Sequence, residues 1–113
     1  MIKEGQLYKL LESNDDSKYA AIVEINEQYV IYYIFHYFEM NVSNSLLNDT
    51  IYADMEFGGL VDTFDFMTIA DFQLKLDGYL GKLEIRNLTY LKSELKKSEI
   101  CIFLKSKGVQ LWI

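Results

Sequence analysis

The sequence predicts a mainly β domain, either an antiparallel small barrel or a two-layer sandwich, with about seven to eight short strands and one or two short helices. Two observations predict it: apolar side chains alternate with a period of two along much of the chain, and short turn signals separate the alternating runs. An α+β fold, with helices on one face of an antiparallel sheet, is the alternative. A length of 113 residues favours a single domain over residues 1–113.

The first predicted strands lie in the N-terminal third of the chain. Residues from Lys18 to Ile25 alternate, and Asn26-Glu27 supplies a short turn. The next run, Gln28 to Met40, is rich in Tyr, Ile, Val and Phe on both faces, which favours a central strand. Ile2 to Leu11 has no decisive period, and it suits the first strand of a small barrel.

The clearest alternation lies between Thr50 and Phe57, after a polar stretch from Asn41 to Asp49 that predicts a loop. Apolar residues occupy one side of this strand, and Tyr and acidic residues occupy the other, so we expect one wet acidic face. Gly58-Gly59 is a tight-turn signal, and Leu60 to Met67 is the predicted return strand.

Residues 68–88 fit two interpretations. Thr68 followed three positions later by Asp71 resembles a helix N-cap, and apolar residues after it share a helical face. Against this, apolar residues also alternate on both sides of Asp77-Gly78, a favoured hairpin turn. The alternation slightly favours the hairpin.

The C-terminal region predicts one helix and one hairpin. Leucines spaced i, i+3 and i+7 predict a short amphipathic helix from Asn87 to Lys97, with lysines in its last turn. Ile100 to Leu104 then alternates, Lys107-Gly108 offers a turn, and Val109 to Ile113 alternates again. We therefore expect a C-terminal hairpin.

Charge is divided unevenly along the chain, whose formal net charge is −6. Residues 19–74 contain nine acidic residues and no Lys or Arg, whereas residues 75–113 contain eight basic residues and four acidic ones. Surfaces selected only for solubility mix the two signs. Either the basic C-terminal third folds back onto the acidic middle, or the acidic middle faces a basic partner.

Sequence motifs for catalysis and for cofactor binding are absent. A Cys–His dyad requires Cys101 beside His36, and Cys101 lies in an apolar run where a buried, inert thiol is the ordinary outcome. One Cys and one His are too few for a zinc site, and the acidic clusters do not match a calcium loop. Gly58-Gly59 lacks the Lys and Ser/Thr of a phosphate-binding loop. We expect no enzyme activity, metal or cofactor.

The sequence favours a cytoplasmic location. A single cysteine forms no internal disulfide, and the N-terminal residues lack the apolar core of a signal peptide. The longest apolar run, Tyr29 to Phe38, is shorter than the roughly 20 residues of a membrane-spanning helix. The absence of proline and the excess of Lys over Arg suggest an AT-rich bacterial or phage mobile-element gene.

The predicted binding surface is the acidic strand face with the loop before it and the strand after it. Aromatic residues are favoured interface anchors, and carboxylates around them complement Lys or Arg on a partner. A solvated acidic sheet face with no partner is the alternative. The residues are Asp49, Tyr52, Asp54, Glu56, Asp62 and Asp65.

These features predict a non-enzymatic acidic inhibitor, specifically a bacterial immunity protein that neutralises a toxin such as a nuclease by binding its basic surface. A phage anti-defence inhibitor has the same electrostatics. A nucleic-acid-binding or adaptor module that uses the basic C-terminal third is a further alternative, although the acidic middle opposes phosphate contacts. We expect a monomer or a homodimer and no membrane contact.

Overall fold

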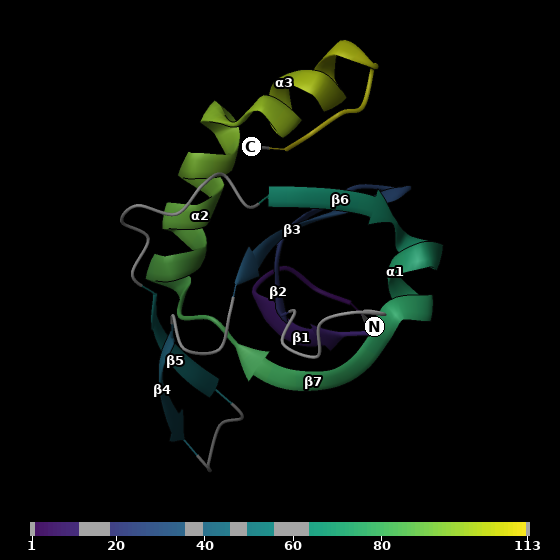
Figure 1. Cartoon of the computed structure of the whole chain (residues 1–113). Helices are drawn as coiled ribbons and strands as arrows, with labels where there is room; N and C mark the ends of the chain where they lie inside the picture. The colour runs from purple at the N-terminus through teal and green to yellow at the C-terminus, as the bar shows by residue number, and fades with distance from the viewer. Residues whose placement is uncertain (1, 12–18, 36–39, 46–49, 56–63, 113) are drawn as a thin grey trace.

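A curved antiparallel sheet of five strands, in the order β7-β1-β2-β3-β6, forms the centre of the computed structural model (Figure 1). The structure describes residues 2–11, 19–35, 40–45, 50–55 and 64–112. The fold is mainly β with three helices, close to the α+β alternative. Its elements are β1 (Gln6–Leu10), β2 (Tyr19–Ile25), β3 (Tyr29–Phe35), β4 (Met40–Ser45), β5 (Thr50–Met55), β6 (Phe64–Thr68), α1 (Ile69–Lys75), β7 (Leu76–Lys82), α2 (Ile85–Lys97) and α3 (Glu99–Ser106).

Both faces of the sheet are buried, which explains why its central strands are apolar on both sides. Ile31 and Tyr33 of β3 face a cluster that includes the buried side chains of α2 and α3. Val30 and Tyr32 of the same strand face a second cluster that includes Phe72 of α1. Because β3 lies between β2 and β6, the prediction that this run is an inner strand is confirmed.

The sheet is not closed into a barrel, so the predicted barrel is wrong. Within the described residues β6 and β7 are the two edges of the five-strand sheet, and no strand pairing joins them to each other. Instead α1 runs directly from the end of β6 to the start of β7 (Figure 1). Its only buried residue, Phe72, packs between Tyr8 and Tyr32 at ring-centroid distances of 6.1 and 5.4 Å. Apolar packing by a helix replaces the hydrogen bonds that would close a barrel.

Two further strands extend the sheet beyond β7. β4 and β5 form an antiparallel ribbon, and β5 meets β7 through one parallel pair, Thr50 with Lys82. β6 pairs with β3 and not with β5, so the predicted hairpin across Gly58-Gly59 does not form between these strands. Gly58-Gly59 lies outside the described residues, and the register of the return strand is set by its pairing with β3.

Residues 68–88 form a helix and then a strand, so the favoured hairpin is wrong. The Thr68 hydroxyl accepts a hydrogen bond from the Asp71 N–H at 3.1 Å, which is the N-cap that the spacing offered as the alternative. Gly78 lies within β7, where it pairs with Lys9, and is not at a turn. Asp77-Gly78 is therefore extended. The burial of Phe72 in α1 outweighs the local turn preference of this pair.

The C-terminal hairpin is also wrong, because residues 99–106 form α3. The Ser98 hydroxyl accepts a hydrogen bond from the Cys101 N–H at 3.2 Å, and Glu99 lies in the first turn, where the helix dipole favours an acid. Cys101 and Leu104, three positions apart, are buried against the sheet together with Leu91 and Leu95 of α2. α2 itself confirms the predicted amphipathic helix, with two extra residues at its N-terminus.

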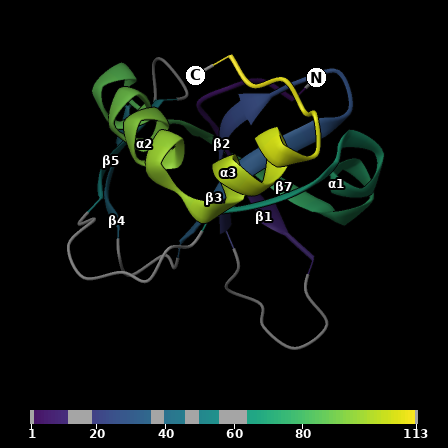
Figure 2. The same ribbon diagram turned by 90° about the horizontal axis from the view of Figure 1, so that it is seen from above.

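α2 and α3 pack on one face of the sheet, and α1 packs on the other. In the view from above, α2 and α3 cross the sheet on the same side while α1 lies at the sheet's end (Figure 2). Among the described residues, no helix is long and apolar enough to cross a membrane. The chain then returns from α3 through residues 107–112 towards the turn between β2 and β3, and this return forms the cleft described below.

Substituting Phe72→Ala is expected to lower the free energy of unfolding by about 3–5 kcal/mol, because the ring is fully buried against Tyr8 of β1 and Tyr32 of β3. Urea denaturation followed by circular dichroism measures this change. Leu74→Ala is the matched control, since Leu74 lies in the same helix and is 78% exposed. Equal losses for the two variants would contradict the role assigned to Phe72.

Candidate functional site

The predicted acidic surface lies mostly outside the described residues. Asp49, Glu56 and Asp62 fall in segments that the structure does not describe. Tyr52 and Asp54 lie on β5, where they pair in register with Ser43 and Asn41 of β4, and their side chains are not described.

Asp65 is described, and it lies away from the ribbon. It sits on β6 opposite Tyr32 of β3, at the other end of the strand order from β5. Its Oδ1 accepts a hydrogen bond from the Phe66 N–H at 2.8 Å. The structure therefore does not bring Asp65 onto the same strand pair as Tyr52 and Asp54.

Cys101 is a buried thiol in the first turn of α3. It belongs to the apolar cluster between α3 and the sheet, and 1% of its surface is exposed. His36, the other member of the dyad, lies outside the described residues. Among the residues that the structure describes, no group of three or more His, Cys, Asp or Glu is arranged to hold a metal ion.

A buried carboxylate that the sequence did not single out lies beneath α2. Glu24 of β2 is 1% exposed, its Oε2 lies 4.0 Å from Lys92 Nζ, and its Oε1 accepts a hydrogen bond from the Trp112 N–H at 3.3 Å. Lys92 Nζ also lies 2.7 Å from Oε2 of Glu4. The cluster therefore joins the segment before β1, strand β2, helix α2 and the C-terminal segment.

A β-bulge explains why Glu24 is buried on the helix side. Strict alternation places Glu24 on the face of Ile22, but the register between β2 and β3 shifts between these two residues. After the shift Glu24 stands opposite Ile31, and residues directly opposite each other share a face. Ile31 faces the α2 and α3 cluster, so Glu24 points at Lys92.

Burial raises the pKa of the Glu24 carboxyl, and the nearby Glu4 carboxylate raises it further. The Lys92 ammonium and the Trp112 N–H act in the opposite direction and offset only part of the rise. Oε2 of Glu24 has no hydrogen-bond partner, and a buried carboxylate with an unsatisfied oxygen is costly in its charged form. One carboxylate oxygen of Glu24 thus holds the C-terminal segment, while the other oxygen has no hydrogen-bond donor.

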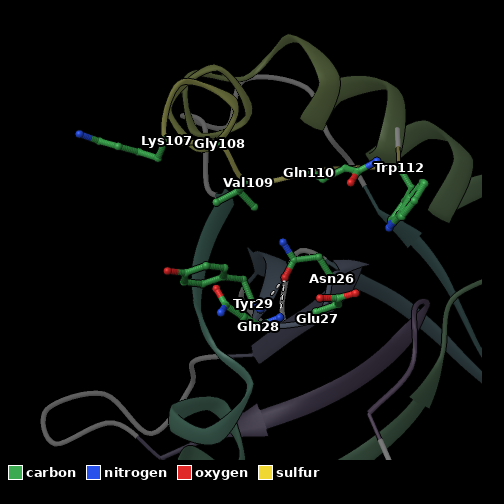
Figure 3. Close-up of a pocket in the computed structure, with 9 residues that line it drawn as sticks. All are labelled: Asn26, Glu27, Gln28, Tyr29, Lys107, Gly108, Val109, Gln110 and Trp112. Carbon is green, nitrogen blue, oxygen red and sulfur yellow. Dashed lines mark hydrogen bonds between the residues drawn. The ribbon is translucent and has the colours of Figure 1, made fainter.

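Above this cluster, a cleft of about 400 Å³ separates the β2–β3 turn from the C-terminal segment (Figure 3). One wall is the turn, where the Asn26 side-chain oxygen accepts hydrogen bonds from the N–H groups of Gln28 and Tyr29 at 2.9 and 2.6 Å. The volume falls in the range of small-ligand sites. The lining residues are Asn26, Glu27, Gln28, Tyr29, Lys107, Gly108, Val109, Gln110 and Trp112.

An aromatic row continues from the turn wall of the cleft towards α3. Tyr29 packs edge-on against Phe66 at 5.9 Å between ring centroids, and Phe66 lies 6.1 Å from Phe103. Lys107 Nζ lies 5.6 Å from the centroid of the Phe103 ring, a cation–π contact. This contact favours the direction of the Lys107 side chain that Figure 3 shows, which extends away from the cleft.

The sequence and the structure were compared with known proteins. No protein-family model matches the sequence, no curated protein matches it, and no solved structure matches the fold.

The sequence carried one signal for Glu24 and none for the cleft. Glu24 is the only charged residue in the otherwise apolar run from Tyr19 to Ile25, which marks it as a buried or edge position. Trp112 and Glu27 are 85 positions apart and line the same cleft, because residues 109–112 return from the turn at Gly108 to the β2–β3 turn. The predicted hairpin would instead have paired these residues with residues 100–104, which form part of α3.

We expect the stability of the wild-type chain, relative to Glu24→Gln, to increase as the pH falls from about 7 towards 5. The folded state binds the Glu24 proton more tightly than the unfolded state does, because the pKa of Glu24 is raised above the ordinary glutamate value of 4.5. The stabilisation is therefore present at low pH and is lost as the pH rises through the raised pKa. Urea denaturation across this range measures it, and Glu94→Gln on the exposed face of α2 is the control. A difference that falls on acidification would contradict the assignment.

Proposed function

We propose that this chain is a non-enzymatic binding protein that recognises a basic surface of another protein through the acidic residues of its middle segment. The observation that carries the proposal is the charge partition: residues 19–74 contain nine acidic residues and no cation. A field of one sign steers association with an oppositely charged partner and raises the association rate.

The described ion pairs support a partner-facing role for the acidic segment. Of the four acidic residues in 19–74 whose side chains the structure describes, Glu24 alone pairs with a cation, and Glu24 is buried. Glu27, Asp65 and Asp71 form no ion pair with another described residue. The basic C-terminal third therefore leaves these three carboxylates free for another protein.

The specific form that we propose is a cytoplasmic bacterial immunity protein that neutralises a toxin such as a nuclease. Enzymes that cleave nucleic acids need basic clefts to bind phosphates, so a small acidic protein can cover such a cleft without any chemistry of its own. The small size, the acidity and the absence of catalytic motifs in the sequence support this form. A phage anti-defence inhibitor differs only in its target, and a toxin gene directly upstream distinguishes the two.

The C-terminal lysines favour this proposal over a nucleic-acid-binding module. Lys92 is engaged by Glu4 and Glu24, and Lys97 lies 3.9 Å from Glu94 on its own helix. Lys107 is held over the Phe103 ring. Each lysine that already pairs with a group of this chain is less available for a phosphate contact.

The charge-reversal variant Asp54→Lys with Glu56→Lys is expected to slow association with the partner on the order of tenfold at low salt. An affinity pull-down from the source cell, with the captured protein identified by mass, supplies the partner. Stopped-flow mixing then measures the association rate as a function of salt, and the difference between variant and wild type should shrink as salt screens the charges.

The control is Asp77→Lys with Glu94→Lys, which changes the net charge equally at two acids of the C-terminal third. Circular dichroism verifies that both double variants fold. An association rate at low salt that is unchanged by the Asp54 and Glu56 reversal, or lowered equally by the control, would refute the acidic segment as the binding surface.

A further inference from the structure

We propose that the cleft between the β2–β3 turn and the C-terminal segment binds the guanidinium group of an arginine side chain, between the Glu27 carboxylate and the Trp112 indole. This inference rests on the proposed function, since it names the group that a basic partner inserts. The arginine of the partner would bind in this cleft, which is distinct from the acidic strand face around Asp54.

The two principal residues stand on opposite walls of one cleft. Glu27 is exposed on the turn between β2 and β3, and Trp112 is 73% exposed on the C-terminal segment. Figure 3 shows the indole at the end of the cleft opposite Lys107, with Glu27 on the turn below it. Tryptophan is the aromatic side chain that binds cations best, and an exposed tryptophan beside a cleft is an unused anchor.

The backbone beneath the indole is held in place. The Trp112 N–H donates to the buried Glu24, and Leu111 is 9% exposed within the apolar cluster of α2 and α3. The indole is therefore presented to solvent from an anchored segment. An anchored aromatic residue loses little conformational entropy when a ligand stacks on it.

The charge at this end of the cleft favours a cation. Glu27 makes no ion pair with another described residue, and Glu24, which accepts from the Trp112 N–H, shares the one cation Lys92 with Glu4. The remaining charge of the lining belongs to Lys107, whose ammonium is directed onto Phe103 and away from the cleft. A cationic group that enters near Trp112 thus meets a net negative field.

The shape and the amide lining favour guanidinium over ammonium. A guanidinium is planar, stacks on an indole and presents several N–H donors, whereas an ammonium is a compact and strongly hydrated charge. The Gln28 and Gln110 side chains line the cleft from its two walls, and their amide oxygens add hydrogen-bond acceptors to the lining. The Asn26 oxygen is already occupied by the turn backbone.

The test uses N-acetyl-arginine amide as the probe and nuclear magnetic resonance as the readout. Trp112 is the only tryptophan, so its indole N–H gives a single, unambiguous signal. We expect this signal and the side-chain amide signals of Gln28 and Gln110 to shift progressively with probe concentration. N-acetyl-citrulline amide, which is uncharged and nearly isosteric, is the matched control at equal chloride, and it should bind at least about threefold more weakly.

Three variants separate the cleft from general electrostatics. Glu27→Gln should weaken binding of the arginine probe about threefold, while Glu94→Gln, a matched change on α2, should leave it unchanged. Trp112→Leu keeps the backbone N–H that donates to Glu24 and should also weaken binding, monitored through the glutamine amides. Equal binding of the citrulline probe, no shift at about 100 mM arginine probe, or wild-type affinity in Glu27→Gln would overturn the inference.

The outcome for the partner separates this inference from the proposed function. If reversal of Asp54 and Glu56 slows association with the basic partner but Glu27→Gln and Trp112→Leu do not change its affinity, the proposed function stands and the inference is overturned. If none of these variants affects a basic partner while the arginine probe binds the cleft of the wild type, the cleft is a cation site and the proposed function fails. Loss of partner affinity in all of them supports both.

Discussion

The burial of both faces of one curved sheet is the constraint on which this structure depends. A five-strand sheet that packs on helices along one face needs cover on its other face too, and Phe72 of α1 supplies part of that cover. α1 also links β6 directly to β7, so the helix that carries Phe72 connects the two edges of the five-strand sheet. Curvature is added by the bulge in β7, where Gly81 adopts φ of 128°, a conformation that L side chains rarely adopt.

The sequence predicted correctly the elements for which it carried a single local pattern. The predictions failed where two local patterns favoured different structures. The two-sided apolar run of β3 and the leucine spacing of α2 were decisive, since nothing local opposed them. At Asp77-Gly78 the hairpin signal competed with the Thr68 cap, and the outcome was decided by the burial of Phe72. At residues 99–106 a period of two and a period of 3.6 both fit, and Ser98 capping together with burial of Cys101 and Leu104 decided for the helix.

The candidate site was less predictable than the fold, because each of its parts depends on a register shift or a long-range contact that no local sequence pattern encodes. A one-residue bulge in β2 turns Glu24 from one face to the other, and alternation alone places it on the wrong side. The cleft needs residues 109–112 to lie against the β2–β3 turn, whereas the predicted hairpin paired them with residues 100–104. Asp65, assigned to a return strand beside Asp54, is carried to the opposite end of the sheet by the pairing of β6 with β3.

The position of Glu24 also determines what the charge partition means on the surface. A lysine of the basic third that paired with an exposed acid of the middle segment would neutralise surface charge. Lys92 instead pairs with a buried acid and with Glu4, so it crosses between the two charge blocks without reducing the exposed negative charge of Glu27, Asp65 or Asp71. Lys92 thus offsets the charge of a buried acid. The same buried carboxylate accepts the hydrogen bond that holds the C-terminal segment in place. For the acidic residues that the structure describes, folding preserves the separation of charge that the sequence contains, and that separation is what a basic partner would meet.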